Sequence, residues 1–187
     1  MRRLLAVVGS PRRGGNTDIL ISKIAEGARA AGADVEQLFL GKMTVRECDG
    51  CHLCWRGDKC SKSDDMTAAY AKITASDVII FGTPVYWYGP SGLMKVFIDR
   101  FVYFNCEANR KKIKGKEAVV AIVLEEENVS TARLTVEFFE KSLAYLEMRL
   151  AAKIIVPGVG GKGDILRKDD CLKEAERIGR GLAQAAT

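Results

Sequence analysis

The sequence predicts an α/β protein in which a parallel sheet of five strands lies between two layers of helices. Short apolar stretches with the character of buried strands alternate with stretches of helical periodicity along the whole chain. Such alternation is typical of a parallel sheet that is covered on both faces. Because crossovers between parallel strands are right-handed, few strand orders remain, and 2-1-3-4-5 is the usual one for five strands. The 187 residues suit one domain, so we expect residues 1–187 to share one fold.

The first half of the chain is predicted to hold three strands and two helices. Gly32 ends a stretch of helical periodicity, and Asp64 and Asp65 can cap a second helix. Asp77 precedes the third apolar run, which is short enough for a buried strand. The elements expected here are strand 4–8, helix 17–31, strand 35–40, a cysteine-rich loop at about 46–65, helix 66–75 and strand 78–81.

The second half continues the alternation with two strands and three helices. Ser91 can cap the helix that follows a loop at 82–90, and Pro157 and Gly158 end the last strand. The elements expected here are helix 91–104, strand 118–124, helix 129–148, strand 153–156 and helix 169–185. In sheets of this kind, ligands bind beyond the carboxyl ends of the strands, where the strand order reverses. The distinctive residues follow the first three strands, so we expect them to meet at this edge.

The composition excludes several classes of protein. The net charge of +5 is modest, and the basic residues are too scattered for a nucleic-acid surface. No apolar run approaches the roughly 20 residues that span a bilayer. The apolar run after Arg2 and Arg3 is too short for a signal peptide and breaks at Gly9. We therefore expect a cytoplasmic protein that binds neither nucleic acid nor membrane, in which clustered cysteines bind metal or do redox work.

Four of the six cysteines fall within thirteen residues, at Cys48, Cys51, Cys54 and Cys60. Their spacing is C-x2-C-x2-C-x5-C, and soft thiolate ligands select iron–sulfur clusters, zinc or copper(I). Zinc prefers two separated C-x2-C pairs, and this run has no such gap, so the spacing favours an iron–sulfur cluster. A cysteine-rich surface loop without metal is the alternative. The single histidine, His52, lies inside this loop.

The segment between the first strand and the first helix has the residues of a phosphate site. Ser10, Asn16 and Thr17 can donate hydrogen bonds, Arg12 can pair with a dianion, and Gly15 lets the backbone approach closely. The segment lacks the lysine of a nucleoside-triphosphate loop and the G-x-G-x-x-G spacing of a dinucleotide site. The alternative is a plain turn that Asn16 or Thr17 caps. Its position after the first strand favours the phosphate site.

The segment from Thr83 to Gly92 follows the third strand and is rich in aromatic residues. Pro84 and Gly89 restrict its backbone, while Tyr86, Trp87 and Tyr88 supply aromatic surface. A flat heteroaromatic ring can pack against such a loop. The alternative is that the aromatic side chains cover the core or a subunit interface, where aromatic residues are enriched.

Together, Gly-Ser-Pro-Arg-x-x-Gly-Asn-Thr and Thr-Pro-Val-Tyr-x-Tyr-Gly resemble the phosphate and isoalloxazine loops of flavodoxin-like, NAD(P)H-dependent FMN reductases. With the cysteine spacing, the chain resembles the iron–sulfur flavoproteins, in which a compact cysteine motif carries a 4Fe-4S cluster beside FMN. The resemblance implies a flavodoxin-like three-layer sandwich and cluster ligands at Cys48, Cys51, Cys54 and Cys60. It implies that the FMN site draws on two loops, with the residues Ser10, Arg12, Gly15, Asn16, Thr17, Thr83, Pro84, Val85, Tyr86, Trp87 and Gly89.

These observations lead to three hypotheses about function. The first is an FMN-dependent oxidoreductase in which a 4Fe-4S cluster and FMN exchange electrons, with NAD(P)H, a ferredoxin-type protein or a small-molecule acceptor as partners. The second is a cluster-free NAD(P)H-dependent FMN or quinone reductase, and the third is a flavodoxin-like binding module with structural zinc. No side chain need be catalytic, because the flavin carries the chemistry. The resemblance also implies a homo-dimer or tetramer, and the aromatic segment suggests that its interface lies near the redox site.

Overall fold

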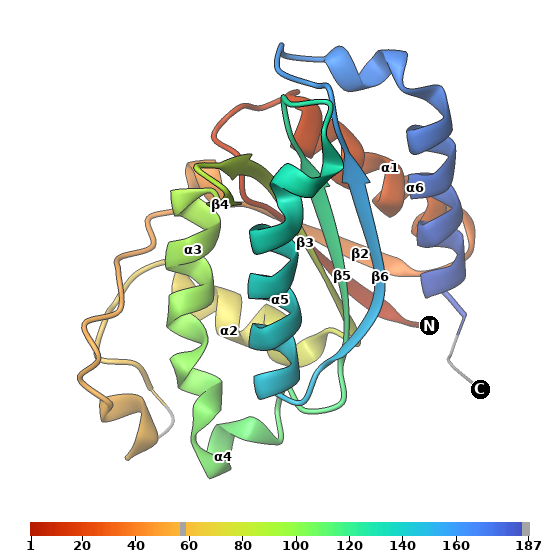
Figure 1. Ribbon diagram of the computed structural model, residues 1–187. Helices are drawn as coiled ribbons and strands as arrows, with labels where there is room; N and C mark the ends of the chain where they lie inside the picture. Colours follow the sequence, from red (N-terminus) through yellow and green to blue (C-terminus); the bar gives the residue numbers. More distant parts are fainter. Residues whose placement is uncertain (57–58, 185–187) are drawn as a thin grey trace.

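Five parallel strands form the central sheet in the order β2-β1-β3-β5-β6 (Figure 1). The structure is a computed structural model that describes residues 1–56 and 59–184. The order of the parallel strands is the predicted 2-1-3-4-5, since β5 and β6 are the fourth and fifth of them. The predicted flavodoxin-like fold is therefore confirmed. The strands are β1 Arg3–Val8, β2 Asp34–Phe39, β3 Val78–Tyr86, β4 Gly89–Pro90, β5 Glu117–Val123 and β6 Arg149–Val156.

Two of the predicted helices are divided into α-helical and 3-10 segments. The helix expected at 91–104 is α-helical to Asp99 and then tightens into a 3-10 helix. The helix expected at 129–148 starts as a 3-10 turn and ends at Tyr145, before Glu147 adopts a left-handed backbone (φ 58°). The α-helices are α1 Asn16–Ala30, α2 Met66–Ala75, α3 Gly92–Asp99, α4 Glu107–Arg110, α5 Arg133–Tyr145 and α6 Asp169–Leu182. The expected end of the last helix, residue 185, lies outside the described residues.

The 3-10 helices are shorter and mostly join the main elements. They are η1 Leu40–Lys42, η2 Leu53–Trp55, η3 Arg100–Asn105, η4 Val129–Ala132 and η5 Asp164–Arg167. Among the described residues, no helix is both long and apolar enough to cross a membrane.

Helices cover both faces of the sheet and create a core on each side. Helices α1 and α6 cover one face, and α2, α3 and α5 cover the other (Figure 1). Alternate side chains of β1 enter different cores, with Leu4 in the core beneath α1 and α6 and Leu5 in the other. On the first face the two helices cross closely, because a Cβ atom on Gly27 would lie 2.1 Å from the carbonyl oxygen of Glu176. A Cβ on Gly179 would lie 2.0 Å from the oxygen of Ile24. Glycine at both positions therefore allows the close crossing that sets the position of α1. The predicted phosphate site lies at the start of this helix.

The segment expected as a loop at 82–90 is largely strand. β3 continues to Tyr86, and β4 returns antiparallel to it, pairing Tyr86 with Gly89 and Val85 with Pro90. Trp87 and Tyr88 form the turn with φ angles of 50° and 62°. Two consecutive positive φ angles are the geometry of a tight hairpin turn, which favours Asn and Gly over aromatic residues. The sequence did not predict the hairpin because its turn lacks those residues.

Candidate functional site

A pocket lies at the carboxyl edge of the sheet, between the ends of β1, β3 and β5. It brings together eight of the predicted cofactor-binding residues: Ser10, Arg12, Gly15, Asn16, Thr17, Pro84, Val85 and Tyr86. Thr83, Trp87 and Gly89 do not line it. The residues that complete the lining come from the ends of β5 and β6 and are Val123, Leu124, Glu125, Glu126, Val159, Gly160 and Lys162.

The loop before α1 is folded tightly by its own backbone. The Gly15 N–H donates to the carbonyl of Arg12 at 3.0 Å, and the Arg12 N–H donates to the Ser10 hydroxyl oxygen at 3.2 Å. Gly14 has a positive φ of 65°, and its N–H donates to the carboxylate of Asp18 at 2.8 Å. The first N–H groups of α1 have no acceptor within the helix, and this end of the helix lies at the pocket. Such a helix terminus favours an anion.

Asn16 and Thr17 play different parts in this loop. The Asn16 amide donates to the carbonyls of Val159 and Gly161 at 2.9 and 2.8 Å, and its oxygen accepts from the Ile165 N–H at 3.2 Å. Its side chain therefore joins the phosphate loop to the segment after β6. The Thr17 hydroxyl makes no hydrogen bond to protein in the part of the chain that the structure describes. It is the better placed of the two side chains to donate to a ligand.

The electrostatics of the pocket come partly from residues that the sequence analysis did not select. Lys162, after β6, lines the pocket together with Arg12, so two cations lie at the predicted phosphate site. Glu125 and Glu126 line it from the end of β5. A glycine-rich segment around Lys162 marked a loop in the sequence, but no local pattern linked that loop to residue 12.

The aromatic hairpin is fixed to the phosphate loop by two buried hydroxyl side chains. The Thr83 hydroxyl accepts from the Ser91 N–H at 3.0 Å, and the Ser91 hydroxyl donates to the Gly9 carbonyl. Thr83 is fully buried, so its side chain supports the site from behind. At the tip of the hairpin, Trp87 is 97% exposed. This tryptophan, held by a strained turn, has no partner among the described residues and is available to a ligand or to another chain.

The cysteine loop follows a path that the sequence did not predict. It leaves the carboxyl edge after β2, runs beside α3 and reaches the region of α4, where η2 lies (Figure 1). The Trp55 indole N–H donates to the Val102 carbonyl in η3 at 3.0 Å, and Cys54 is buried. The expectation that the cysteines lie at the flavin edge is therefore wrong. The eight residues of α3, about 12 Å of helix, separate that edge from η3.

The sulfur atoms of the loop differ in exposure. Burial, together with the nearby Cys60, Cys106 and Cys48, raises the pKa of the Cys54 thiol to about 11. Cys51 is exposed, with its sulfur 3.2 Å from the Ser61 hydroxyl. All of these cysteines are free thiols, and no three Cys, His, Asp or Glu side chains among residues 1–56 and 59–184 form a metal-binding group.

Cys106, which lies outside the cysteine-rich segment of the sequence, is a neighbour of the loop in the structure. Its sulfur lies 3.8 Å from the carbonyl oxygen of Cys54 and 3.7 Å from that of Tyr103. The two cysteines are 52 positions apart in the chain, and the contact depends on the turn between η3 and α4. No signal in the sequence links them.

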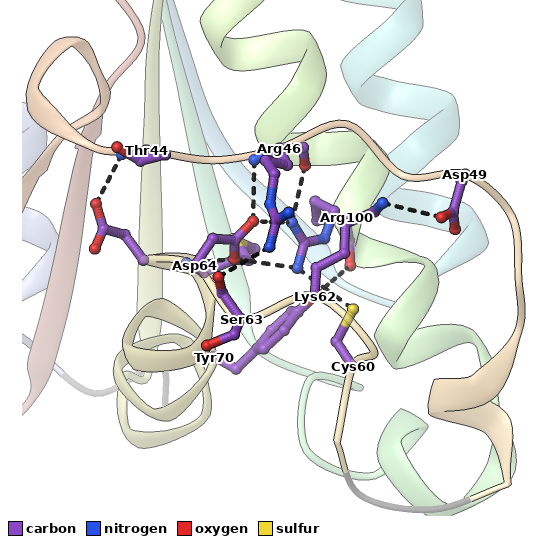
Figure 2. A network of polar contacts seen from close by, with 11 residues as sticks. Thr44, Arg46, Asp49, Cys60, Lys62, Ser63, Asp64, Tyr70 and Arg100 are labelled. Atoms are coloured by element: carbon purple, nitrogen blue, oxygen red, sulfur yellow. Dashed lines mark hydrogen bonds and ion pairs between the residues drawn. The ribbon is translucent and has the colours of Figure 1, made fainter.

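Polar contacts hold the two ends of the cysteine loop together, and the Asp64–Arg100 ion pair among them is buried (Figure 2). The Asp64 carboxylate accepts hydrogen bonds from the Arg46 N–H at 3.0 Å and from the Arg100 guanidinium at 2.6 Å. The Asp65 carboxylate accepts from the Thr44 N–H at 2.7 Å. Because Thr44 and Arg46 precede the first cysteine and the two aspartates follow the last, these contacts close the loop at its base.

Comparison with known proteins places this site in a family. The family model of NADPH-dependent FMN reductases matches residues 2–153. An iron-sulfur flavoprotein of Archaeoglobus fulgidus is 29% identical over 188 residues, covering 98% of this chain and 80% of that protein. A Bacillus subtilis relative, whose name describes an NAD(P)H-dependent FMN-containing oxidoreductase, is 27% identical over 94% of this chain and 96% of its own.

Two further matches extend the comparison. A second iron-sulfur flavoprotein of A. fulgidus is 39% identical over 98 residues, so the match spans about half of each protein, 52% of this chain and 48% of the relative. Among solved structures, the Trp repressor binding protein from B. subtilis superposes with a TM-score of 0.72 at 25% identity, covering 95% of this chain and 98% of that one.

The chain belongs to the NADPH-dependent FMN reductase family. The pocket fits this assignment, because a helix N-terminus, two cations and an apolar strand end meet where the family's cofactor would lie. The protein is therefore a flavin-dependent oxidoreductase, and the family implies FMN and NAD(P)H as its cofactors.

Proposed function

We propose that this oxidoreductase exchanges electrons between FMN in the carboxyl-edge pocket and a 4Fe-4S cluster held by Cys48, Cys51, Cys54 and Cys60. When bound, FMN exchanges electrons one or two at a time, and the cluster exchanges them singly. The observation that carries the proposal is a loop of four free thiols whose two ends are joined through the buried ion pair of Arg100 and Asp64. The names of the A. fulgidus relatives support the same combination of cofactors.

For FMN, the residues assign a binding role to each part of the pocket. The first turn of α1, the Thr17 hydroxyl and the cations Arg12 and Lys162 would hold the phosphate. The backbone of β3 from Pro84 to Tyr86 would border the flavin ring. The released flavin should be FMN rather than FAD, because the cradle holds one phosphate.

The four cysteine sulfurs are suitable ligands for an iron–sulfur cluster, but the loop would have to close around the cluster. Thiolates are the usual ligands of iron–sulfur clusters. Cys54 is buried and near Cys48 and Cys60, whereas Cys51 is exposed and must turn inward. Gly50 and His52 flank Cys51 with positive φ angles of 69° and 54°, so Cys51 lies between two left-handed backbone positions.

The separation of the two sites favours a homo-oligomer. Within one chain, electrons would have to travel the length of α3. Trp87 is exposed at the flavin site, and an apolar groove between η3 and α5, lined by Phe101, Val102, Phe138 and Tyr145, lies near the cysteine loop. A twofold assembly that covers these surfaces could bring the loop of one chain toward the pocket of another. Light scattering at micromolar concentration should give at least twice the monomer mass, and a clean monomer with full flavin occupancy would contradict this arrangement.

The experiment for the electron-transfer proposal compares Cys54→Ser with Cys171→Ser, both purified anaerobically. Cys171 lies in α6, on the other face of the sheet, and is the matched control. We expect Cys54→Ser to lose iron and sulfide and retain FMN, while Cys171→Ser retains both. With NAD(P)H as the donor, the wild type should reduce a one-electron acceptor faster than Cys54→Ser. Equal iron, sulfide and acceptor rates in the two variants would overturn the proposal.

The second candidate is a cluster-free NAD(P)H-dependent reductase, which the exposed Cys51 and the lack of a formed metal group in the described residues favour. In that case the wild type and Cys54→Ser would carry full FMN, contain no iron and reduce quinones at equal rates. Stoichiometric zinc in the wild type would instead indicate a structural site in the loop.

A further inference from the structure

Arg100 is the largest fully buried side chain among the residues that the structure describes, and it lies beside the cysteine loop. Its side chain and that of Asp64 are each only 1% exposed and form an ion pair at 2.6 Å. Transferring two charges out of water is costly, and an apolar pair of similar size is often at least as stable. A pair this deeply buried therefore calls for an explanation beyond stability.

The guanidinium contacts both ends of the cysteine loop at once (Figure 2). Nη1 donates to the Arg46 carbonyl at 2.8 Å and to one Asp64 oxygen, and Nη2 donates to the other oxygen at 3.3 Å. In addition, Nη2 lies 3.4 Å from the sulfur of Cys60. The Tyr70 hydroxyl also fixes the backbone of Arg100, because it donates to the Arg100 carbonyl at 3.0 Å.

The contact with Cys60 is not needed to close the loop. Asp64 and the Arg46 carbonyl already join the ends, and they occupy Nη1 and part of Nη2. A neutral thiol gains little from a buried cation, whereas a metal-bound thiolate carries negative charge and accepts charge-assisted hydrogen bonds. Hydrogen bonds to the sulfurs also help to set the reduction potential of an iron–sulfur cluster.

We infer that Arg100 is a positioning residue for the cluster: its guanidinium orients the Cys60 sulfur as a ligand and offsets part of the cluster's negative charge. The inference rests on the function proposed above. Lysine at this position can pair with Asp64, but it has no planar fork with which to reach Cys60 and Arg46 together. Arg100→Lys therefore separates the ion pair from the contact with sulfur.

The experiment compares the wild type, Arg100→Lys and Arg110→Lys, each purified anaerobically with its cofactors. Arg110 is the matched control, since it is half-buried beside the same 3-10 helix and donates to the Phe104 carbonyl at 3.1 Å without contacting the cysteine loop. The readouts are FMN content, thermal midpoint, the rate of iron loss to excess chelator and the midpoint potential of the cluster.

We expect Arg100→Lys to keep its FMN and to lose iron on the order of 10-fold faster than the wild type, the range seen when a partner of a metal ligand is removed. Its cluster should also have a lower reduction potential, because a hydrogen bond that stabilises the more negative, reduced state is lost. Arg110→Lys should match the wild type in both properties.

Equal iron loss and equal potential in Arg100→Lys and Arg110→Lys would overturn the inference. So would a loss of FMN and iron together with a lowered thermal midpoint, since that pattern indicates a purely structural role. A wild type that contains no iron refutes the proposed function itself. That failure is seen before any variant is compared, so it is distinct from a failure of Arg100 alone.

Discussion

The two loops to which we assign cofactor binding are built in opposite ways. The phosphate loop joins β1 to α1, both of which contribute to a core, and Asn16 and Ser91 tie it to distant segments. The cysteine loop runs for about twenty residues with only the short helix η2 and is held mainly at its base. The first loop is shaped before a ligand arrives, whereas the second keeps an exposed cysteine and would have to close around the proposed cluster.

This difference matches the chemistry that each loop serves. A phosphate is recognised by fixed backbone N–H groups, so a rigid cradle lowers the entropy lost on binding. A cluster supplies its own bonds to the thiolates, and metal binding can be coupled to the folding of its site. We expect substitutions at the base of the cysteine loop to affect stability and metal, and substitutions in the phosphate loop to affect flavin.

The largest effect should come from Asp64→Asn at the base of the cysteine loop. The change leaves the Arg100 cation buried without its partner, which typically costs about 3–5 kcal/mol of unfolding free energy. Urea unfolding at pH 7 measures the loss, with the exposed Asp99→Asn as the control. A loss of unfolding free energy below about 1 kcal/mol would mean that the base of the cysteine loop opens locally and is not held closed by the ion pair.

The same variant should show a defined dependence on pH. Burial acts to raise the pKa of the Asp64 carboxyl, but hydrogen bonds from Arg100 and from the Arg46 and Met66 amides outweigh it, so the pKa is lowered. The ion pair then stabilises the fold fully above the unfolded value of about 4 and loses this effect as the pH falls through the lower native pKa. The stability gap between wild type and Asp64→Asn should therefore narrow below about pH 4, and a constant gap would contradict the assignment.

Asn16→Ala should have the next largest effect. The substitution removes three hydrogen bonds that connect the phosphate loop to the segment after β6. Each contributes about 1 kcal/mol to the free energy of unfolding, so the expected loss is about 3 kcal/mol in total. Both stability and FMN affinity should fall, because the cradle loses its support. The control is Asn128→Ala, an exposed cap of η4. Unchanged stability would show that the phosphate loop does not depend on these bonds.

Thr17→Val should weaken FMN binding without unfolding the protein. The change removes one hydroxyl donor to a charged group, worth roughly 1–3 kcal/mol in binding. A fluorescence titration of the apoprotein with FMN measures the loss, and Thr131→Val, outside the pocket, is the control. An unchanged affinity would exclude the Thr17 hydroxyl from the phosphate site.

The smallest effect concerns the hairpin turn. Trp87→Gly and Trp87→Ala both remove the exposed ring, but only glycine adopts a φ of 50° without strain. The glycine variant should be more stable than the alanine variant by about 1 kcal/mol. If thermal unfolding ranks the two variants in the opposite order, the turn is not strained.

The sequence predicted the sheet well because each strand is a buried apolar run whose order follows from right-handed crossovers. Ser10, Arg12 and Thr17 are close in the chain, so the sequence also predicted part of the lining of the carboxyl-edge pocket. It did not find the path of the cysteine loop, which has no periodicity to interpret. The sequence did not predict the role of Arg100 either, because an arginine in a helical segment is usually exposed. Only the fold brings Arg100 against Asp64, 36 positions away.

Lys162 shows the same limit at the carboxyl-edge pocket. It follows the last strand, and only the parallel sheet places that strand's end near the loop after the first. Side chains that act through distant contacts carry no local pattern, so they emerge only from the structure.

The most direct test of this account is the cofactor content of the wild-type protein purified without oxygen. Flavin, iron, acid-labile sulfide and zinc are measured per chain in one preparation. The account predicts one FMN with about four irons and four sulfides, as a 4Fe-4S cluster on four cysteines requires, and no zinc. One FMN with no iron, or with stoichiometric zinc, would contradict it.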